Sequence, residues 1–367
     1  MSRDTRALID LAALRHNLEV ARRSAPGSRI MAVVKANAYG HGLLPAARAL
    51  AAADGFAVSS LAEAVPLREA GFIHPILLLQ GLYEASELST VERCRLDLVV
   101  HSLWQVEILE RARTERPLIV WLKVDSGMHR LGLAPEVVPD AYRRLQNAAA
   151  VGEIRFMTHL ANADDRNSDY TRDQLQQFER ACAGLAGARS IANSAGLLGW
   201  QGSHSEWVRP GIMLYGVSPF LDSVSARHDL RPVMTLTSRL IAINQCRRGD
   251  RVGYGGAFVC PEDMRVGIAT IGYGDGYPRH AGTGTPVLVR GQPSQILGRV
   301  SMDMLCVDLR GVPDAAVHDP VTLWGRGLPV EKVAAHCDTI PYELLCKVTA
   351  RVRFDYEDGD GQSTRSL

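Results

Sequence analysis

The sequence predicts an α/β fold in two parts, an N-terminal (β/α)8 TIM-like barrel followed by a mostly β C-terminal domain. Two observations favour this prediction. In the first 210 residues, short apolar runs alternate with stretches whose apolar residues recur at helical spacing. After about Pro232 the runs are rich in β-branched residues, and clusters of glycine, proline and aspartate separate them.

The barrel strands are expected at the apolar runs of the first part, and each run except the last is followed by a helical pattern. In Leu43–Ala53 the apolar side chains share one helix face, and Val137–Ala149 shows the same spacing. A doubly wound sheet would alternate similarly, but no G-x-G-x-x-G sequence follows a run, so a dinucleotide-binding half lacks support. The predicted strands are Ile30–Val34, Phe56–Val58, Ile76–Leu79, Leu96–Val100, Leu118–Val124, Ile154–Met157, Ser190–Ala192 and Trp207–Val208.

The second part is expected to form a domain of its own. We place the boundary near residue 230, with the barrel in residues 1–230 and the β domain in residues 231–367. Its predicted strands are Met234–Leu240, Val266–Ile271, Pro286–Val289, Ser294–Leu297, Met304–Leu309 and Pro320–Leu323.

Composition narrows the classes of protein that the chain can represent. The net charge is +1, so no excess of positive charge points to nucleic acid or to an anionic membrane as a partner. The seven cysteines contain no C-x-x-C pair, which argues against a disulfide framework and a zinc site. Neither a signal-peptide core nor an apolar run long enough to span a membrane is present, so we expect a cytoplasmic protein.

A barrel of this kind places its active site at the carboxyl ends of the strands, and Lys35 directly follows the first one. A lysine in this place is often a surface residue whose stem packs on the core. The functional interpretation is a Schiff-base lysine, whose amine becomes nucleophilic when desolvation lowers its pKa.

Further polar residues follow the later strands. Arg130 comes after the fifth strand and can hold a carboxylate or a phenolate, and His159 after the sixth is by itself more often structural. After strands 7 and 8, Ser194 offers a hydroxyl and Gly211-Ile212 offers backbone N–H groups, in the loops where barrels commonly bind phosphate. A lysine beside a phosphate site is what pyridoxal 5'-phosphate (PLP) requires, and Arg209 is placed to face the pyridine nitrogen.

These segments together resemble the alanine racemase family, and the resemblance extends from Ile9 to Val352. Its most specific motif is Ala32-Val33-Val34-Lys35-Ala36-Asn37-Ala38-Tyr39-Gly40-His41-Gly42. The order of the other segments also fits: Lys123-Val124-Asp125 to Arg130, Thr158-His159, Asn193-Ser194, Arg209-Pro210-Gly211-Ile212, Gly253-Tyr254-Gly255, Ile271-Gly272-Tyr273 and Ser301-Met302-Asp303.

The resemblance implies a PLP-dependent isomerase that works as a head-to-tail homodimer, in which the β domain of one subunit completes the active site of the other. It also implies that the first eight or so residues join the β domain. Lys35 would carry PLP, and Tyr254 of the partner subunit would be the opposing base. The remaining implied roles are phosphate binding by Tyr39, Ser194, Gly211 and Ile212, contacts to the cofactor ring by His159 and Arg209, and substrate binding by Arg130, Tyr273 and Met302.

Two positions add detail to the resemblance. In relatives the lysine that matches Lys123 is often carbamylated and orients the arginine that matches Arg130. Many relatives place a phosphate-binding tyrosine just before a C-terminal Arg-Val, where this chain has Ala350 before Arg351-Val352. Tyr356 lies six residues later, so the width of the entryway and the affinity for phosphate stay open, more than the reaction itself.

The implied reaction interconverts L-alanine and D-alanine, with Lys35 moving the proton of the D-enantiomer and Tyr254 that of the L-enantiomer. Because the ordinary pKa of tyrosine is about 10, such a base needs a neighbouring positive charge. Whether the product serves D-alanine biosynthesis for cell wall or breakdown stays open. Three alternatives stay open as well. One is a racemase of serine or lysine, or a decarboxylase of diamino acids; the others are a PLP carrier without catalytic activity and a metal-dependent hydrolase using His159 with Asp164 and Asp165.

Overall fold

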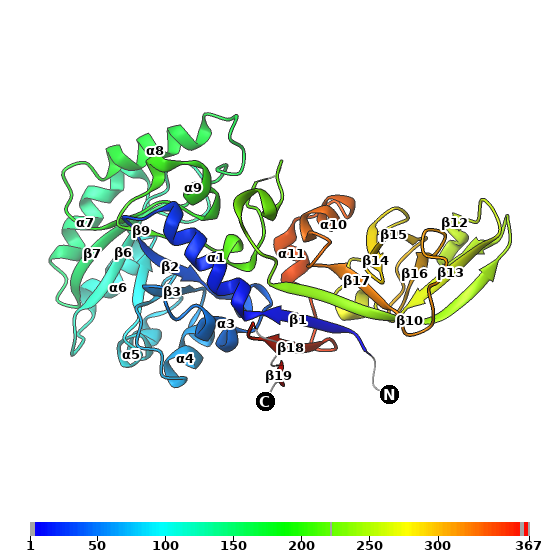
Figure 1. Ribbon diagram of the computed structural model, residues 1–367. Helices are drawn as coiled ribbons and strands as arrows, with labels where there is room; N and C mark the ends of the chain where they lie inside the picture. The colour runs from blue at the N-terminus through cyan, green and yellow to red at the C-terminus, as the bar shows by residue number, and fades with distance from the viewer. Residues whose placement is uncertain (1–3, 221, 360–362, 366–367) are drawn as a thin grey trace.

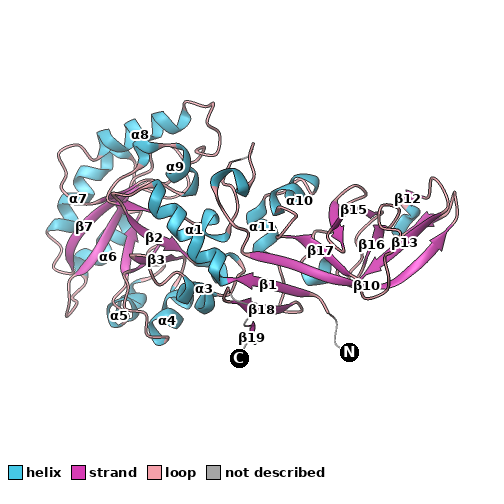
Figure 2. Cartoon of the chain, viewed as in Figure 1, coloured by secondary structure: helices cyan, strands magenta, loops and turns pink. Residues whose placement is uncertain are grey.

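The computed structural model describes residues 4–220, 222–359 and 363–365. Figure 1 shows two parts side by side, a rounded barrel with its helices and an elongated β domain, and the described ends of the chain lie near their junction. Figure 2 shows the barrel strands enclosed by helices, whereas the second part is mostly strand. The predicted fold class, a TIM-like barrel followed by a mostly β domain, is confirmed.

The first part is a closed barrel of parallel strands in sequence order. The apolar runs are strands because a barrel strand is buried on both faces and therefore needs a continuous apolar stretch rather than alternation. Its strands are β2 (Arg29–Val33), β3 (Gly55–Val58), β4 (Ile76–Leu78), β5 (Asp97–Val100), β6 (Leu118–Lys123), β7 (Val151–Met157), β8 (Arg189–Ser190) and β9 (Trp207–Val208).

Helices follow the barrel strands and cover their outer side. The first helix, which precedes the barrel strands, begins at Leu11, and the carboxylate of Asp10 caps it by accepting a hydrogen bond from Ala13 N (2.9 Å). The helices of this part are α1 (Leu11–Ser24), α2 (Lys35–Tyr39), α3 (Leu43–Ala49), α4 (Leu61–Glu69), α5 (Leu88–Arg93), α6 (Leu103–Arg111), α7 (Val138–Gln146), α8 (Tyr170–Ala181) and α9 (Ser194–Gly199). None of the helices in the described part of the chain is long and apolar enough to cross a membrane.

The β domain is built on one nine-stranded sheet in the order β13-β16-β15-β14-β17-β10-β1-β18-β19. Part of it closes on itself, because the long strand β10 pairs with β17 in its first half and with β13 in its second half. The strands are β1 (Arg6–Asp10), β10 (Met234–Cys246), β13 (Met264–Ala269), β14 (Pro286–Val289), β15 (Gln292–Leu297), β16 (Leu305–Asp308), β17 (Pro320–Trp324), β18 (Arg353–Glu357) and β19 (Ser363–Arg365), with the separate hairpin β11 (Arg251–Val252) and β12 (Phe258–Val259).

Strand β1 precedes the barrel in sequence but belongs to the sheet of the β domain. It pairs antiparallel with β10 and parallel with β18, so residues that precede the barrel in sequence lie in the sheet of the β domain. The ranges 1–230 and 231–367 stay a prediction. The prediction that the first eight or so residues join the β domain falls partly on residues 1–3, which lie outside the described residues, and residues 221, 360–362 and 366–367 lie outside them as well.

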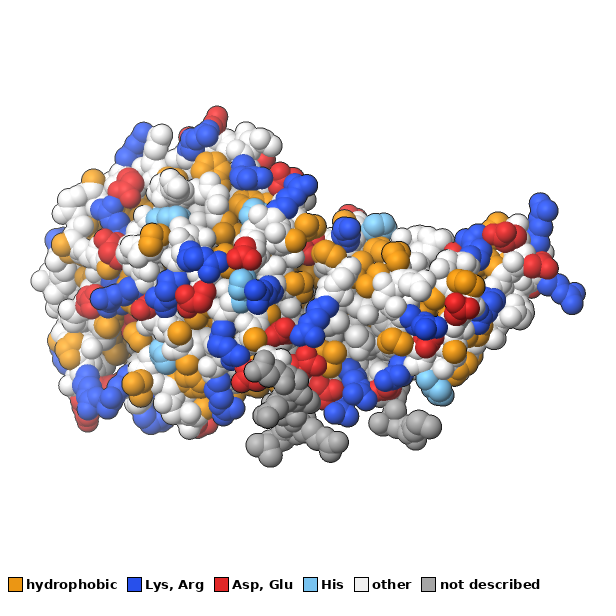
Figure 3. Space-filling model, in the orientation of Figure 1, with side chains coloured by type: hydrophobic (Ala, Val, Ile, Leu, Met, Phe, Trp, Pro, Cys, Tyr) orange, Lys and Arg blue, Asp and Glu red, His pale blue; other side chains and the backbone are white. Residues whose placement is uncertain are grey.

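Two helices of the second part bring it against the barrel. They are α10 (Val330–His336) and α11 (Pro341–Cys346), and α11 packs on α2 at the carboxyl end of β2. On the face drawn in Figure 3, Lys and Arg side chains are interspersed with Asp and Glu, as the balanced composition predicts.

Candidate active site

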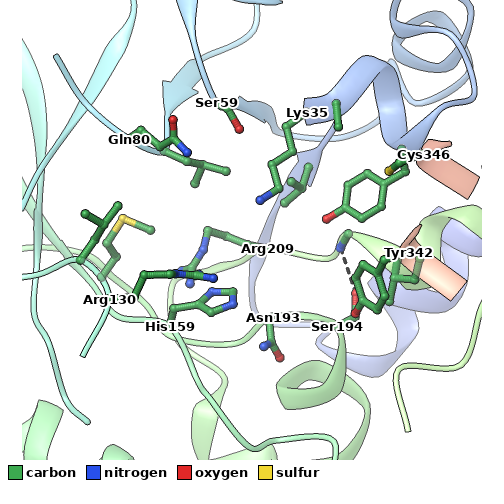
Figure 4. Close-up of a pocket in the computed structure, with 18 of the residues that line it drawn as sticks. Lys35, Ser59, Gln80, Arg130, His159, Asn193, Ser194, Arg209, Tyr342 and Cys346 are labelled. Carbon is green, nitrogen blue, oxygen red and sulfur yellow. Dashed lines mark hydrogen bonds between the residues drawn. The ribbon is translucent and has the colours of Figure 1, made fainter. Parts of the chain in front are cut away.

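A cavity of about 650 Å³ opens at the carboxyl ends of the barrel strands, where a barrel is expected to place its site. Figure 4 shows Lys35, Arg130, His159 and Arg209 converging on it. Most lining residues follow barrel strands, and two come from α11. The lining residues are Val33, Lys35, Ala36, Tyr39, Ser59, Leu79, Gln80, Lys123, Arg130, Leu131, Met157, His159, Asn193, Ser194, Arg209, Gly211, Ile212, Tyr342 and Cys346.

Lys35 begins a turn with an uncommon backbone. Ala36, Asn37, Ala38 and Tyr39 all have φ between +52° and +54°, so α2 is a left-handed turn built without glycine. Each such residue costs roughly 1–2 kcal/mol relative to the right-handed conformation. Hydrogen bonds within the turn, including Ala38 N to Val34 O (2.9 Å), offset part of that cost.

The glycines that follow this turn let the second part of the molecule approach. A β-carbon at Gly40 would overlap the carbonyl oxygen of Leu345 in α11, and one at Gly42 would overlap the hydroxyl of Tyr356 in β18. Both glycines also have positive φ, +81° and +92°. The glycines of the Tyr-Gly-His-Gly sequence therefore hold the Lys35 turn against the C-terminal segment.

The cavity is strongly cationic. It is lined by Lys35, Lys123, Arg130 and Arg209, and no Asp or Glu is among the described residues that line it. Burial, with the charge of Arg130, lowers the pKa of Lys35, and burial with the charge of Arg209 lowers the pKa of Lys123 to about 8. An anionic ligand would relieve this repulsion, so the cavity fits a molecule carrying phosphate and carboxylate groups.

Arg209 is a buried residue of the cavity lining and bonds to neutral atoms. Its guanidinium donates to the carbonyl oxygens of Thr158 and Ile191 and to the hydroxyl of Ser190. Burial lowers the pKa of Arg209 to about 10, which still leaves the group charged at neutral pH. Burial, together with the charge of Arg209, also lowers the pKa of His159, so that imidazole is neutral.

A second group of polar atoms, which we call the phosphate cradle, surrounds Ser194 and Gly211 in the lining of the cavity. The Ser194 hydroxyl oxygen accepts hydrogen bonds from Gly211 N (2.9 Å, dashed in Figure 4) and Met213 N (3.3 Å). The Tyr39 hydroxyl lies where a β-carbon of Gly211 would be, so the absence of a side chain there admits the phenol. Because these two N–H groups donate to the Ser194 oxygen, the Ser194 O–H is left to donate to a ligand, and with the Tyr39 hydroxyl it is a suitable donor set for phosphate.

Several lining residues were not predicted from the sequence, among them Ser59, Leu79 and Gln80 at the ends of barrel strands and two from α11. Tyr342 and Cys346 project into the cavity from α11, and the Tyr342 ring lies 6.0 Å from that of Tyr39, centroid to centroid. Ala350 is not among the described residues that line the cavity, and a tyrosine lines it from eight positions earlier. Tyr356 instead packs against Gly42, outside the lining.

Three residues implied by the resemblance lie outside this cavity. Tyr254, Tyr273 and Met302 belong to the β domain, and they are 67%, 40% and 53% exposed. Their loops adjoin one another: Tyr273 N donates to Ser301 O (3.0 Å), and a β-carbon at Gly253 would lie 3.9 Å from Arg299 N. Within one chain, therefore, Lys35, Arg130, His159 and Arg209 meet in the cavity, whereas Tyr254, Tyr273 and Met302 lie elsewhere, on the β domain.

Comparisons with known proteins agree with this geometry. Sequence models described as the N-terminal and the C-terminal domain of alanine racemase match residues 9–219 and 233–356. An alanine racemase of Halorhodospira halophila is 54% identical over 98% of this chain and 100% of its own length. A protein of Pseudomonas putida named "Alanine racemase, catabolic" is 52% identical over 96% and 99%.

A solved structure gives the same result in three dimensions. The biosynthetic alanine racemase from Pseudomonas aeruginosa superposes with a TM-score of 0.95 and 47% identity, covering 97% of this chain and 99% of that one. Both family matches and the fold thus confirm the resemblance seen in the motifs. The chain belongs to the alanine racemase family, whose members are PLP-dependent isomerases.

Proposed function

We propose that this chain is an alanine racemase that interconverts L-alanine and D-alanine, with Lys35 and Tyr254 as the two bases. The observation that carries the proposal is the cavity itself, in which Lys35 follows a barrel strand beside a phosphate cradle and among cations that no lining carboxylate neutralises. When bound, PLP withdraws electrons from the α-carbon of an amino acid and so makes the α-proton acidic enough for a side chain to remove.

The residues present fit PLP by their donor chemistry. Ser194, Tyr39 and the backbone of Gly211 and Ile212 would hold its phosphate, and His159 would flank its ring. Arg209 would face the pyridine nitrogen, and since it stays protonated it would keep that nitrogen unprotonated. A less electron-withdrawing ring favours return of the proton over side reactions, as a racemase requires.

Lys35 is suited to take and return a proton on one face of the substrate. Burial and the charge of Arg130 lower its pKa, so a larger fraction of the amine is neutral near pH 7 than for an exposed lysine. Arg130 would pair with the substrate carboxylate. A carboxylate held there is fixed in the same cavity as the Lys35 amine.

Tyr254 needs a second copy of the chain to reach a substrate. It lies on the β domain and is exposed, as are Tyr273 and Met302, and none of the three is among the described residues that line the Lys35 cavity. We therefore propose a head-to-tail homodimer in which these three residues cover the cavity of the partner subunit, Tyr254 as the opposing base and the other two against the substrate. A cytoplasmic location is part of the proposal, supported by the free cysteines.

A racemase of another small amino acid is the alternative that one observation keeps open. Cys346 and Tyr342 line the cavity together with Lys35, and its volume of about 650 Å³ leaves room for a side chain larger than a methyl group. Serine differs from alanine by one hydroxyl, so a pocket of this kind separates the two weakly. For the hydrolase alternative, no group of three or more His, Cys, Asp or Glu within residues 4–220, 222–359 and 363–365 could hold a metal ion.

The test is incubation of L-alanine with PLP-loaded protein in heavy water, following circular dichroism and the α-proton NMR signal together. The proposal predicts that the dichroism decays to zero while deuterium enters the α-carbon. Serine and lysine assayed in parallel measure the substrate range. Unchanged signals with alanine, from a protein that binds PLP, would contradict the proposal and favour another substrate.

A further inference from the structure

The carboxylate of Glu63 joins the ends of two barrel strands. Its Oε1 accepts a hydrogen bond from Ala36 N (2.6 Å), the residue after Lys35, and its Oε2 accepts one from Ser59 N (2.7 Å), just after β3. Ala36 and Ser59 both line the cavity. One side chain from α4 therefore joins the segment that follows β2, beside Lys35, to the segment that follows β3.

The sequence around Glu63 predicts a different, purely local role. Ser60-Leu61-Ala62-Glu63 has the pattern of a capping box, in which the glutamate would bind the backbone N–H of Ser60 and stabilise the start of α4. The structure shows Ser60 at the N-cap without a side-chain cap, and both oxygens of Glu63 bonded to Ser59 and to Ala36. One of these two bonds serves the segment after β2, not the helix.

The bond to Ala36 is made where the backbone is under strain. Ala36 is the first of the four left-handed residues, and its N–H is the last backbone donor before they begin. A hydrogen bond to this N–H fixes the position at which the strand ends, and with it the direction in which the Lys35 side chain leaves the backbone. We propose that Glu63 is a positioning residue for Lys35, which sets the direction and the charge environment of its amine.

The charge of Glu63 acts in the same place. Its carboxylate raises the pKa of Lys35, against burial and the charge of Arg130, which lower it. Glu63 is partly buried and is absent from the cavity lining, so it influences the amine without contacting a ligand there. Removing the charge should lower the pKa of Lys35 further, and removing a hydrogen bond should loosen the turn.

This inference rests on the proposed role of Lys35 as the PLP lysine, and the first readout of its test, the pH midpoint of PLP attachment, needs no amino-acid substrate. Apoprotein is mixed with PLP over a range of pH, and the rate of the covalent link to Lys35 is followed by visible absorbance and fixed by borohydride for peptide mass analysis. Because the neutral amine attacks, the rate rises with pH through the pKa of Lys35. We expect Glu63→Gln to move this midpoint to lower pH and, after loading, to reduce racemisation kcat about tenfold.

Glu331 provides a matched control. Its Oε1 accepts hydrogen bonds from Ser218 N and Ser225 N, both 3.0 Å, so it also bridges two backbone N–H groups, away from the cavity lining. Glu331→Gln should keep the wild-type midpoint and kcat. If PLP attachment has the same pH midpoint in Glu63→Gln and in Glu331→Gln, the inference is wrong, and this outcome does not depend on whether the wild type racemises alanine.

A second variant keeps the test decisive if Glu63→Gln does not fold. Glu63→Asp retains the charge but is one methylene too short to reach both Ala36 and Ser59. We expect its midpoint to stay near that of the wild type while kcat falls. Wild-type kcat in Glu63→Asp would refute the positioning role.

Discussion

Replacing Gly40 with alanine tests whether close approach of α11 shapes the Lys35 site. Gly40 has φ of +81°, where an alanine costs about 1 kcal/mol. The new β-carbon would also overlap the Leu345 carbonyl oxygen and lie 3.0 Å from the carbonyl carbon, so α11 would have to move by roughly 1 Å. Such overpacking typically adds about 1–3 kcal/mol, for a total loss of about 2–4 kcal/mol.

The same shift should disturb the cavity, because α11 carries Tyr342 and Cys346 into it. We expect weaker PLP binding and lower racemisation in Gly40→Ala, with the free energy of unfolding measured by urea titration. Gly71→Ala is the control, since Gly71 has a similar φ of +87° and nothing within 4 Å of its would-be β-carbon. If Gly40→Ala costs no more than Gly71→Ala, the close contact does not constrain the site.

Three further predictions concern charge and assembly. Burial raises the pKa of Asp97 to about 6, and Arg155 at 3.6 Å offsets only part of this rise, so folding favours the protonated carboxyl and the folded state loses stability as pH rises from about 4 through 6. Because an amide cannot ionise, the free energy of unfolding of Asp97→Asn should rise relative to wild type by up to about 3 kcal/mol between pH 4 and pH 7, and a difference that is constant with pH would contradict this. Mixing inactive Lys35→Ala and Tyr254→Phe chains should restore about a quarter of wild-type activity if sites are shared between subunits, and none if each site belongs to one chain. With its pKa near 8, Lys123 should take up carbon dioxide, giving a carbamate signal with ¹³C-bicarbonate that fades on acidification and is absent in Lys123→Gln.

The barrel is largely predictable from the sequence because its strands are buried on both faces. Trp207–Val208 is predicted and observed with the same bounds, and Ile30–Val34 differs from β2 by one residue at each end. Strand β10 is harder: the prediction ends at Leu240, but the strand continues to Cys246 through partly exposed residues. Its second half is held by pairing with β13, a contact that the local pattern does not reveal.

The site shows the same division between local and tertiary information. Lys35, Arg130, His159 and Arg209 follow strand ends, so the barrel rule is enough to predict that they meet. Tyr342 and Cys346 come from about 300 residues further along the chain, and only the packing of α11 on α2 brings them to the cavity. The left-handed turn contains no glycine between Ala36 and Tyr39, so neither the composition nor the periodicity of the sequence predicts it.

That turn also explains why the C-terminal segment matters to a site built by the barrel. Four left-handed residues cost roughly 4–8 kcal/mol together, more than the few hydrogen bonds within the turn return. The remaining stabilisation comes from outside: Glu63 binds Ala36 N, the Tyr39 ring stacks on that of Tyr215 at 4.7 Å, and α11 packs against Gly40. Because these contacts are tertiary, the position of Lys35 depends on both parts of the molecule being folded together. A strained backbone at a reactive lysine is thus retained because three independent elements converge to hold it.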